Sequence, residues 1–219
     1  MLELDQLHSL MIKSFVIKNI IPLSRLIDFC TTSPETINLT YTTSIFETID
    51  SPSVYIWNSM IRGYSNSQNQ YKALTFYQEM VGKGYSPDYF MFPYVFKACS
   101  VLRDVKFGSC VHGFIVNMYV STCLVHMYMC CGEVECGLRV LEDVPKWNGV
   151  AWGSLVSGLV SNNRFREAIE VFSEMERHGV KVDEMVMVDL LVSCGRCKDI
   201  ERGEWFHGIL KELNCDPFL

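Results

Sequence analysis

The sequence predicts an all-α fold: an α-solenoid, or superhelix, built from repeated antiparallel helix-turn-helix units. Three observations predict it. Apolar residues recur at helical spacing along the chain, and no segment alternates apolar and polar residues as a half-buried strand would. Short polar breaks and turns that contain Gly or Pro separate the apolar runs. The chain also matches itself when it is shifted by 95 residues, which indicates a tandem repeat.

The self-match holds one register over most of the chain. Trp57 falls on Trp152 and Gly63 falls on Gly158 without a gap. The other matched pairs are Ser59 with Ser154, Ala73 with Ala168, Glu79 with Glu174, Met80 with Met175, Gly84 with Gly179, Asp88 with Asp183, Cys99 with Cys194, Gly108 with Gly203, and His112 with His207. A helix pair cannot bury two apolar faces alone, whereas stacked pairs bury both and leave a concave surface lined by the first helices.

Each unit is expected to contain a first helix, a polar break, a second helix and a turn. In 54–88 the apolar-periodic runs 54–64 and 71–81 flank a break at 65–67, and Pro87 stops the second helix. On this pattern the chain divides into a partial repeat at 1–19 and repeats at 20–53, 54–88, 89–117, 118–148, 149–183 and 184–219.

The composition excludes several classes of protein. With 219 residues, of which 49% are apolar and 20% charged, the chain can bury a large core and is not intrinsically disordered. Its net charge of −6 excludes binding of nucleic acid by net charge alone. Charged residues interrupt every apolar run before the roughly 18 consecutive residues of a membrane span. The ten cysteines are irregularly spaced and no secretory signal precedes them, so we expect reduced thiols in a reducing compartment.

The repeat motifs resemble those of the pentatricopeptide repeat family. The string WNSMIRGY at 57–64, followed by Glu79-Met80, a Gly turn and Pro87-Asp88, is similar to the standard repeat of that family. The text FKAC at 96–99, followed by Gly108 and His112, resembles its long variant. The run LVHMYMCCGEVECGLRVLEDVP at 124–145 resembles its short variant. Alternation of standard, long and short units is typical of the land-plant PLS subclass of the family.

By this resemblance each unit has a type. The standard repeats are 54–88 and 149–183, the short-type repeats are 20–53 and 118–148, and the long-type repeats are 89–117, which is shortened, and 184–219.

The resemblance implies a right-handed superhelix that binds single-stranded RNA sequence-specifically in mitochondria or plastids. The expected role is C-to-U editing or other transcript processing without catalysis by this chain, so we expect it not to be an enzyme. The expected partners are organellar RNA and an editing enzyme or editing factor that acts in trans, with no membrane, no small-molecule substrate and no cofactor.

Recognition in this family would place one base at each repeat. A polar side chain in the first helix reads the base edge, the last residue of the repeat supports it, and an apolar side chain one turn earlier packs between successive bases. Carried over to this chain, the reading pair of 54–88 is Asn58 with Asp88, which the family associates with uridine. The pair of 118–148 is Thr122 with Asn148, which it associates with adenine.

The remaining units follow this pattern less closely. In 149–183 Asp183 is present, but Gly153 stands at the reading position and has no side chain. Ser24 with Ser53 is the candidate pair of 20–53. The long units place Pro93 and Val188 at the reading position, where neither donates a hydrogen bond, and they are assigned no base. The base-sandwiching residues would be Ile21, Tyr55, Tyr119 and Val150.

Each of these assignments has a structural alternative. Asn58 could be an ordinary polar residue early in a helix, and Asp88 could cap the next helix. Trp57 and Trp152 could stack on bases, but their recurrence beside glycines favours packing between helix pairs.

Catalytic and metal-binding motifs are incomplete. Cys194, Cys197 and His207 supply fewer than the four ligands that a structural zinc site needs. The H-x-E motif of zinc deaminases occurs nowhere in the sequence. We therefore expect no metal site and no deaminase activity.

Two departures from the repeat pattern, together with the lack of a recognisable transit peptide and of a C-terminal domain, suggest a truncated paralogue or an incomplete gene model. The unit 89–117 has 29 residues against 36 in 184–219, and the shortfall falls after Val116. The unit 20–53 carries about three extra residues, and Glu3 and Asp5 are atypical of a transit peptide. The alternative function is that of a protein–protein adaptor without RNA specificity, which the acidic net charge favours. Under this alternative the chain could also be a truncated, non-functional paralogue.

Overall fold

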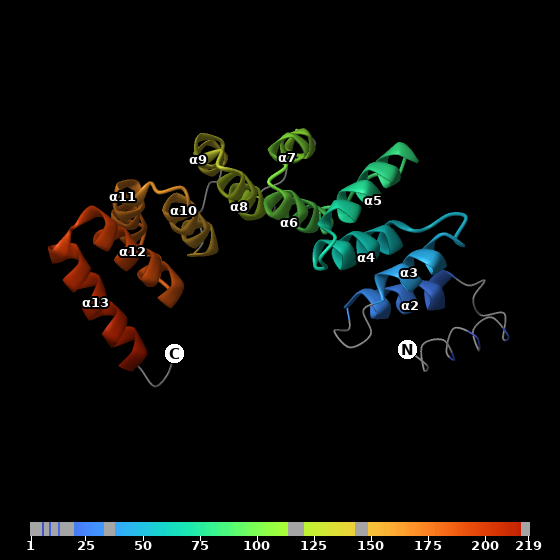
Figure 1. Cartoon of the computed structure of the whole chain (residues 1–219), viewed down its shortest axis with the longest axis horizontal. Coiled ribbons are helices and arrows are strands. Elements are labelled where there is room, and N and C mark those ends of the chain that lie inside the picture. The colour runs from blue at the N-terminus through green and yellow to red at the C-terminus, as the bar shows by residue number, and fades with distance from the viewer. Residues whose placement is uncertain are drawn as a thin grey trace. The chain divides into compact units, whose positions relative to one another are not determined.

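The computed structural model describes residues 6, 9, 13, 20–32, 38–113, 121–142 and 149–215. Within these ranges the secondary structure is entirely helical, which confirms the predicted all-α class (Figure 1). The helices are α2 (Ile20–Thr32), α3 (Leu39–Phe46), α4 (Val54–Ser65), α5 (Gln70–Gly82), α6 (Phe92–Leu102), α7 (Val105–His112), α8 (Ser121–Cys131), α9 (Val134–Glu142), α10 (Gly149–Ser161), α11 (Phe165–Arg177), α12 (Glu184–Cys197) and α13 (Ile200–Cys215).

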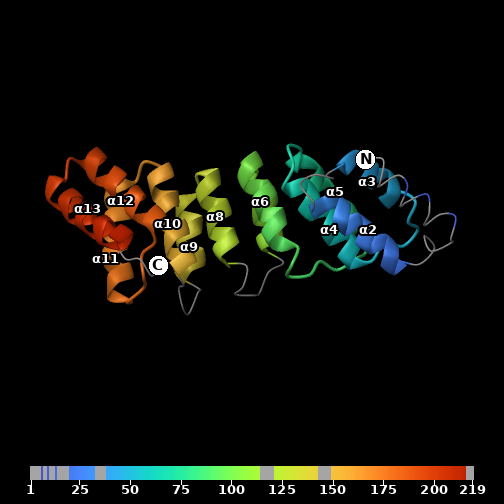
Figure 2. The ribbon, with the colours of Figure 1, turned by 90° about the horizontal axis from the view of Figure 1, so that it is seen from below.

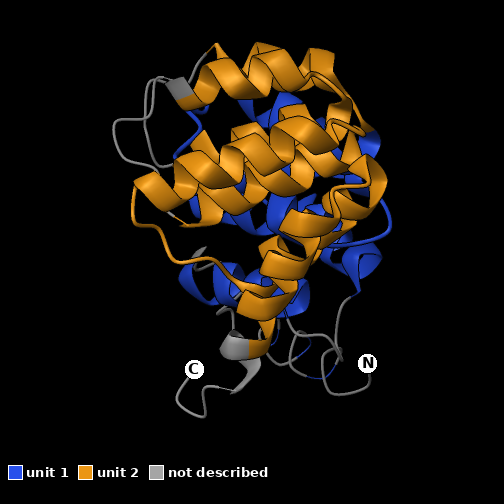
Figure 3. Cartoon of the chain, turned by 90° about the vertical axis from the view of Figure 1, so that its left-hand side faces the viewer, with its two compact units in different colours: residues 1–102 blue, residues 103–219 orange. Residues whose placement is uncertain are grey.

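The chain forms two compact units, residues 1–102 and residues 103–219 (Figure 3). In the first unit α4 packs on α5, and the first helices α2, α4 and α6 pack in succession. In the second unit α8 packs on α9, and α8, α10 and α12 pack in succession, as Figure 2 shows. Within each unit the helices therefore stack in the order expected of a solenoid.

The helices recur at the spacing found in the sequence. Helices α5 and α11 begin and end 95 residues apart, and α4 and α10 begin 95 residues apart. From residue 20 onward each expected repeat contains one pair of helices, from α2 and α3 in 20–53 to α12 and α13 in 184–219.

Glycines and basic residues end helices at matching places. Gly84 and Gly179 follow α5 and α11 with φ of +84° and +65°, a conformation in which glycine carries no steric penalty. Arg103 and Lys198, also 95 residues apart, have φ of +53° and +58° where α6 and α12 end. Positive charge is favourable at a helix C-terminus, which offsets part of the strain of this backbone conformation.

Tryptophans and glycines shared by the two standard repeats form the core. Trp57 is fully buried and packs edge-on against Phe46 and Phe76, with ring centroids 4.7 and 6.1 Å away. Trp152 is also buried, so both tryptophans pack in the core rather than face the solvent. A Cβ atom at Gly158 would lie 2.4 Å from Met129 Cγ, so this glycine allows α10 to approach α8 closely.

The shortened unit 89–117 is divided between the two compact units. Helix α6 belongs to the first unit and packs on α4 and α5, whereas α7 belongs to the second unit and packs on α8. Helix α7 has 8 residues and α13, which begins at the matching position, has 16. Val116, where we placed the shortfall, lies outside the described residues.

Candidate nucleic-acid interface

The reading pair expected in 54–88 is in direct contact. Asn58 lies in the second turn of α4, and Asp88 lies in the segment between α5 and α6. The Nδ2 of Asn58 donates a hydrogen bond of 2.8 Å to Asp88 Oδ2. The other carboxylate oxygen of Asp88 accepts a hydrogen bond of 3.2 Å from the backbone N–H of Met91. Asp88 therefore closes the turn before α6 and also orients Asn58. The structural role and the expected role in the reading pair are thus compatible in this residue.

The contact with Asp88 determines what Asn58 can offer to a ligand. A carboxylate only accepts hydrogen bonds, so the amide NH₂ must face it and the amide oxygen must point elsewhere. This oxygen, Oδ1, is buried and receives no hydrogen bond from any residue that the structure describes. A buried acceptor without a partner costs about 1–3 kcal/mol, and an incoming N–H donor would remove that cost.

Exposed apolar side chains occupy the expected base-sandwiching positions. Ile21, Tyr55 and Val150 are 61%, 51% and 67% exposed, and Tyr119 lies outside the described residues. Each is the second residue of its repeat. A single exposed apolar residue is ordinary, so what distinguishes these three is that they recur at the same position of different repeats.

Sequence reasoning missed two residues of the same kind. Phe90 and Met185 are the second residues of the long units, and they are 62% and 68% exposed. The signal was in the sequence, because the shift of 95 residues that relates Tyr55 to Val150 also relates Phe90 to Met185.

The second standard repeat keeps only half of this arrangement. Asp183 Oδ1 accepts a hydrogen bond of 2.9 Å from the backbone N–H of Val186 and so caps α12. Gly153 stands where 54–88 has Asn58, and a Cβ atom there would lie 3.3 Å from Val186 Cγ2. The capping function of the aspartate is therefore retained without a side chain for it to orient.

The other expected pairs are not brought together within the described residues. The hydroxyl of Ser24 donates to Ile21 O at 2.8 Å within α2, and Ser53 Oγ accepts from Ile56 N at 3.4 Å as the N-cap of α4. Although both serines are described, no hydrogen bond joins them. Thr122 is half-buried in the first turn of α8, and its expected partner Asn148 lies outside the described residues.

A carboxylate on α2 contacts the same face of α4 that carries Asn58. Asp28 Oδ1 accepts a hydrogen bond from Arg62 Nη2 and one of 3.4 Å from Ser59 Oγ. Partial burial, followed by the charge of Asp28 and a hydrogen bond to it, raises the pKa of Tyr55. Sequence analysis did not single out Asp28, because its partners lie about one repeat away along the chain.

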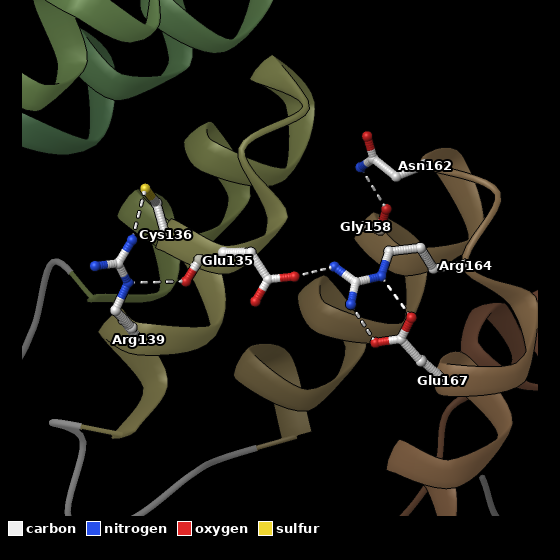
Figure 4. A network of polar contacts seen from close by, with 7 residues as sticks. All are labelled: Glu135, Cys136, Arg139, Gly158, Asn162, Arg164 and Glu167. Atoms are coloured by element: carbon white, nitrogen blue, oxygen red, sulfur yellow. Dashed lines mark hydrogen bonds and ion pairs between the residues drawn. The ribbon is translucent and has the colours of Figure 1, made fainter.

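The second unit contains a polar network that joins neighbouring helix pairs (Figure 4). Arg164 at the start of α11 donates two hydrogen bonds of 2.5 Å to Glu167 and one of 2.6 Å to Glu135 on α9. These bonds to Glu167 and Glu135 raise the pKa of Arg164, which therefore stays charged. Asn162 donates to Gly158 O at 2.8 Å and to Met129 O at 2.9 Å. The network ties α9 and the end of α8 to α10 and α11, which indicates a structural role.

In the described ranges, no group of three or more His, Cys, Asp or Glu side chains has the geometry to hold a metal ion. Nine of the cysteines in these ranges are free thiols, and burial raises the pKa of Cys194, the first cysteine of the C-x-x-C motif. In the same ranges, none of the helices has both the length and the apolar content needed to cross a bilayer.

Comparison with known proteins identifies the repeats. A family model described as the PPR repeat matches residues 55–85 and 150–180. A putative pentatricopeptide repeat-containing protein of Arabidopsis thaliana is 71% identical over 224 residues, which cover 100% of this chain and 40% of that protein. A mitochondrial pentatricopeptide repeat-containing protein of the same plant is 33% identical, over 97% of this chain and 32% of that protein. A chloroplastic one is 31% identical, over 96% of this chain and 36% of that protein.

Solved structures show the same fold. The crystal structure of the maize pentatricopeptide repeat protein PPR10 matches 89% of this chain and 29% of its own, with a TM-score of 0.64 and 21% identity. PPR10 in complex with an 18-nt psaJ RNA element matches 90% of this chain and 30% of its own, with a TM-score of 0.65 and 20% identity. The chain spans between about a third and two fifths of the length of the relatives named above. The matching repeats, the relatives and the solenoid fold together show that the chain belongs to the pentatricopeptide repeat family.

Proposed function

We propose that this chain binds single-stranded RNA in a sequence-dependent way through its row of first helices and supports transcript processing without catalysing a reaction. The six helix pairs from residue 20 onward would be its repeats. The observation that carries the proposal is the pair Asn58–Asp88, in which a carboxylate orients an amide whose oxygen lacks a hydrogen-bond donor.

This amide favours uracil over cytosine at the position that Asn58 reads. Uracil presents an N3–H donor on its Watson–Crick edge, which meets the unsatisfied Oδ1 of Asn58. Cytosine presents an acceptor at N3, so two acceptors would oppose each other after water has been excluded. Leaving them unpaired costs about 1–3 kcal/mol, which corresponds to roughly 5- to 150-fold in affinity.

Exposed side chains around the pair supply the stacking surface. Tyr55 lies one turn before Asn58 on α4, and Phe90 follows Asp88 by two residues. Both are more than half exposed. Stacking of a base on an aromatic ring is worth about 1–3 kcal/mol and tolerates any base. Stacking would thus supply affinity, while the Asn58 amide supplies discrimination.

Finer parts of the proposal are supported by likeness alone. Relatives named as mitochondrial and as chloroplastic support action in an organelle. The order of standard, long and short units supports the PLS subclass, and with it a role in C-to-U editing in which an editing enzyme or factor acts in trans. PPR10 in complex with an RNA element has the same solenoid fold, which supports RNA as the partner.

Binding titrations with short single-stranded RNAs test the proposal. Two oligonucleotides that differ by U or C at one position should bind with different affinity, and Asn58→Ala should remove the difference. Asn69→Ala, in the exposed turn before α5, is the matched control and should preserve it. Equal affinity for all sequences, or no binding by the folded chain, would contradict sequence-dependent recognition.

A protein adaptor is the second candidate function. Met185, Val188 and Val192 are exposed along one face of α12, and the net charge of the chain is −6. Exposed apolar side chains on an acidic chain suit a protein partner better than a phosphate backbone. Failure of every RNA to bind would favour this candidate.

A further inference from the structure

Four residues share one face of α4 and form a continuous strip, which we call the α4 strip: Tyr55, Asn58, Ser59 and Arg62. Their spacing of three, four and seven residues places them on the same side of a helix. Asn58 carries the amide proposed to read a base, and Tyr55 carries the exposed ring proposed to stack on one. The orientation of the α4 strip therefore decides how well both contacts are formed.

Asp28 on α2 contacts the other members of the α4 strip. Its Oδ1 accepts hydrogen bonds from Arg62 Nη2, one turn after Asn58, and from Ser59 Oγ, the residue next to Asn58. The side chains of Arg62 and Asp28 are 28% and 32% exposed, so water screens this ion pair only in part. Partial burial, and after it the charge of Asp28 and a hydrogen bond to it, raises the pKa of Tyr55.

We propose that Asp28 is a positioning residue for base recognition at Asn58, because it fixes the α4 strip against α2 before RNA binds. This inference rests on the proposed RNA-binding function. Asp28 acts from the neighbouring repeat, so the selectivity of the unit 54–88 depends on a side chain in the unit 20–53.

The charge of Asp28 makes this role distinguishable from a simple contribution to affinity. A carboxylate beside an RNA strand repels its phosphates, so removing it should strengthen binding to every sequence. Removing a positioning residue should instead weaken discrimination, because the amide and the ring would have to be ordered when RNA binds. The two effects appear in different quantities, namely the affinity and the ratio of affinities.

The test measures how Asp28→Ala changes the U-to-C affinity ratio at the position where Asn58→Ala removes it. We expect the ratio to fall threefold to tenfold, with affinity for the C-containing RNA unchanged or higher. Asp28→Asn keeps an oxygen that can accept from Arg62 and Ser59, so it should recover part of the ratio. Thermal unfolding of each variant establishes that the chain is folded under the conditions of the titration.

Asp189→Ala is the matched control. Asp189 on α12 accepts a hydrogen bond from Ser157 on α10, so this variant also removes one carboxylate that joins two first helices. It lies in the second unit, next to the repeat whose reading position is Gly153. A ratio that stays unchanged in Asp28→Ala, or that falls equally in Asp189→Ala, would overturn the inference. A wild-type chain without any base preference would instead refute the proposed function itself.

Discussion

The two standard repeats, 54–88 and 149–183, have the same framework but differ in what they present to a ligand. Their helices begin at matching positions, and both bury a tryptophan in the first helix. The first repeat has Asn58 held by Asp88, whereas the second has Gly153 and an Asp183 that caps α12. The residues that specify the helix pair therefore recur, while the residues proposed to face a ligand vary.

The contacts between helix pairs differ as well. In the first unit the ion pair Asp28–Arg62 joins two first helices beside the reading position. In the second unit Arg164 joins the start of α11 to α9, and its counterpart in the first repeat is Asn69. In both units a carboxylate thus joins two first helices, Asp28 with Arg62 in the first and Asp189 with Ser157 in the second, and Arg164 adds an ion pair at the turn region of the second. The predictions below test how the two standard repeats differ in their cores, their reading positions and their polar contacts.

The largest expected effect is the loss of the tryptophan core. Trp57→Ala should destabilise the chain by about 3–5 kcal/mol, the usual cost of removing a large buried aromatic side chain. Trp152→Ala should cost somewhat less within the same range, because Trp152 is 5% exposed whereas Trp57 is fully buried. Urea denaturation followed by helical circular dichroism measures both losses.

Phe at each position is the control for the tryptophan variants. Trp57→Phe keeps a ring and removes an indole N–H that is buried without a hydrogen-bond partner in the described chain, so it should cost far less than Trp57→Ala. A loss at Trp57 no larger than at Trp152 would mean that the slight exposure of Trp152 does not lower the cost of removing its side chain.

The second prediction transfers the reading pair into the repeat that lacks it. Gly153→Asn places an amide near Asp183, and we expect a preference for U at one more RNA position, of about 1–3 kcal/mol if the new oxygen is equally unsatisfied. Val186 must move by a few tenths of an ångström to admit the Cβ atom. Titrations with RNAs that carry U or C at the added position measure the gain.

Gly153→Ala separates the amide from the added Cβ atom. It should stabilise α10 slightly, because alanine is the better helix former, without creating a base preference. If Gly153→Asn binds both RNAs equally while Asn58 still discriminates, the framework of the two repeats is less alike than their helix bounds indicate.

The fold and part of the site could be predicted because they depend on residues that are local in the sequence or repeated in it. The shift of 95 residues anticipates the matching bounds of α5 and α11. The resemblance to the pentatricopeptide repeat family pairs Asn58 with Asp88 across one repeat, and the structure places them within hydrogen-bonding distance. Phe90 and Met185 could have been found by the same register.

What could not be predicted depends on packing between repeats. Asp28 reaches Arg62 only because α2 packs on α4, and nothing in the sequence around Asp28 distinguishes it from other helical carboxylates. The sequence predicts that the unit 89–117 is shortened after Val116, a position that lies outside the described residues. It did not anticipate that α6 and α7 belong to different compact units, because that depends on which helices each of them packs against.

The smallest expected effect concerns the polar network of the second repeat. Arg164→Ala should cost about 0.5–1 kcal/mol at low salt, because its side chain is 30% exposed and partly screened, although three hydrogen bonds act together. Asn69→Ala, the matched change in the first repeat, should have almost no effect, since Asn69 makes no side-chain cap hydrogen bond. Urea denaturation at two salt concentrations measures both.

The two partners of Arg164 should contribute unequally. Glu167 receives two hydrogen bonds, whereas Glu135 receives one and has a side chain that is 71% exposed. Glu167→Gln should therefore cost more than Glu135→Gln, and the cost of both should shrink as salt screens the charges. If Glu135→Gln cost as much as Arg164→Ala, the Arg164–Glu135 ion pair would account for the whole stabilising effect of Arg164. Arg164 would then stabilise the contact between helix pairs rather than the start of α11.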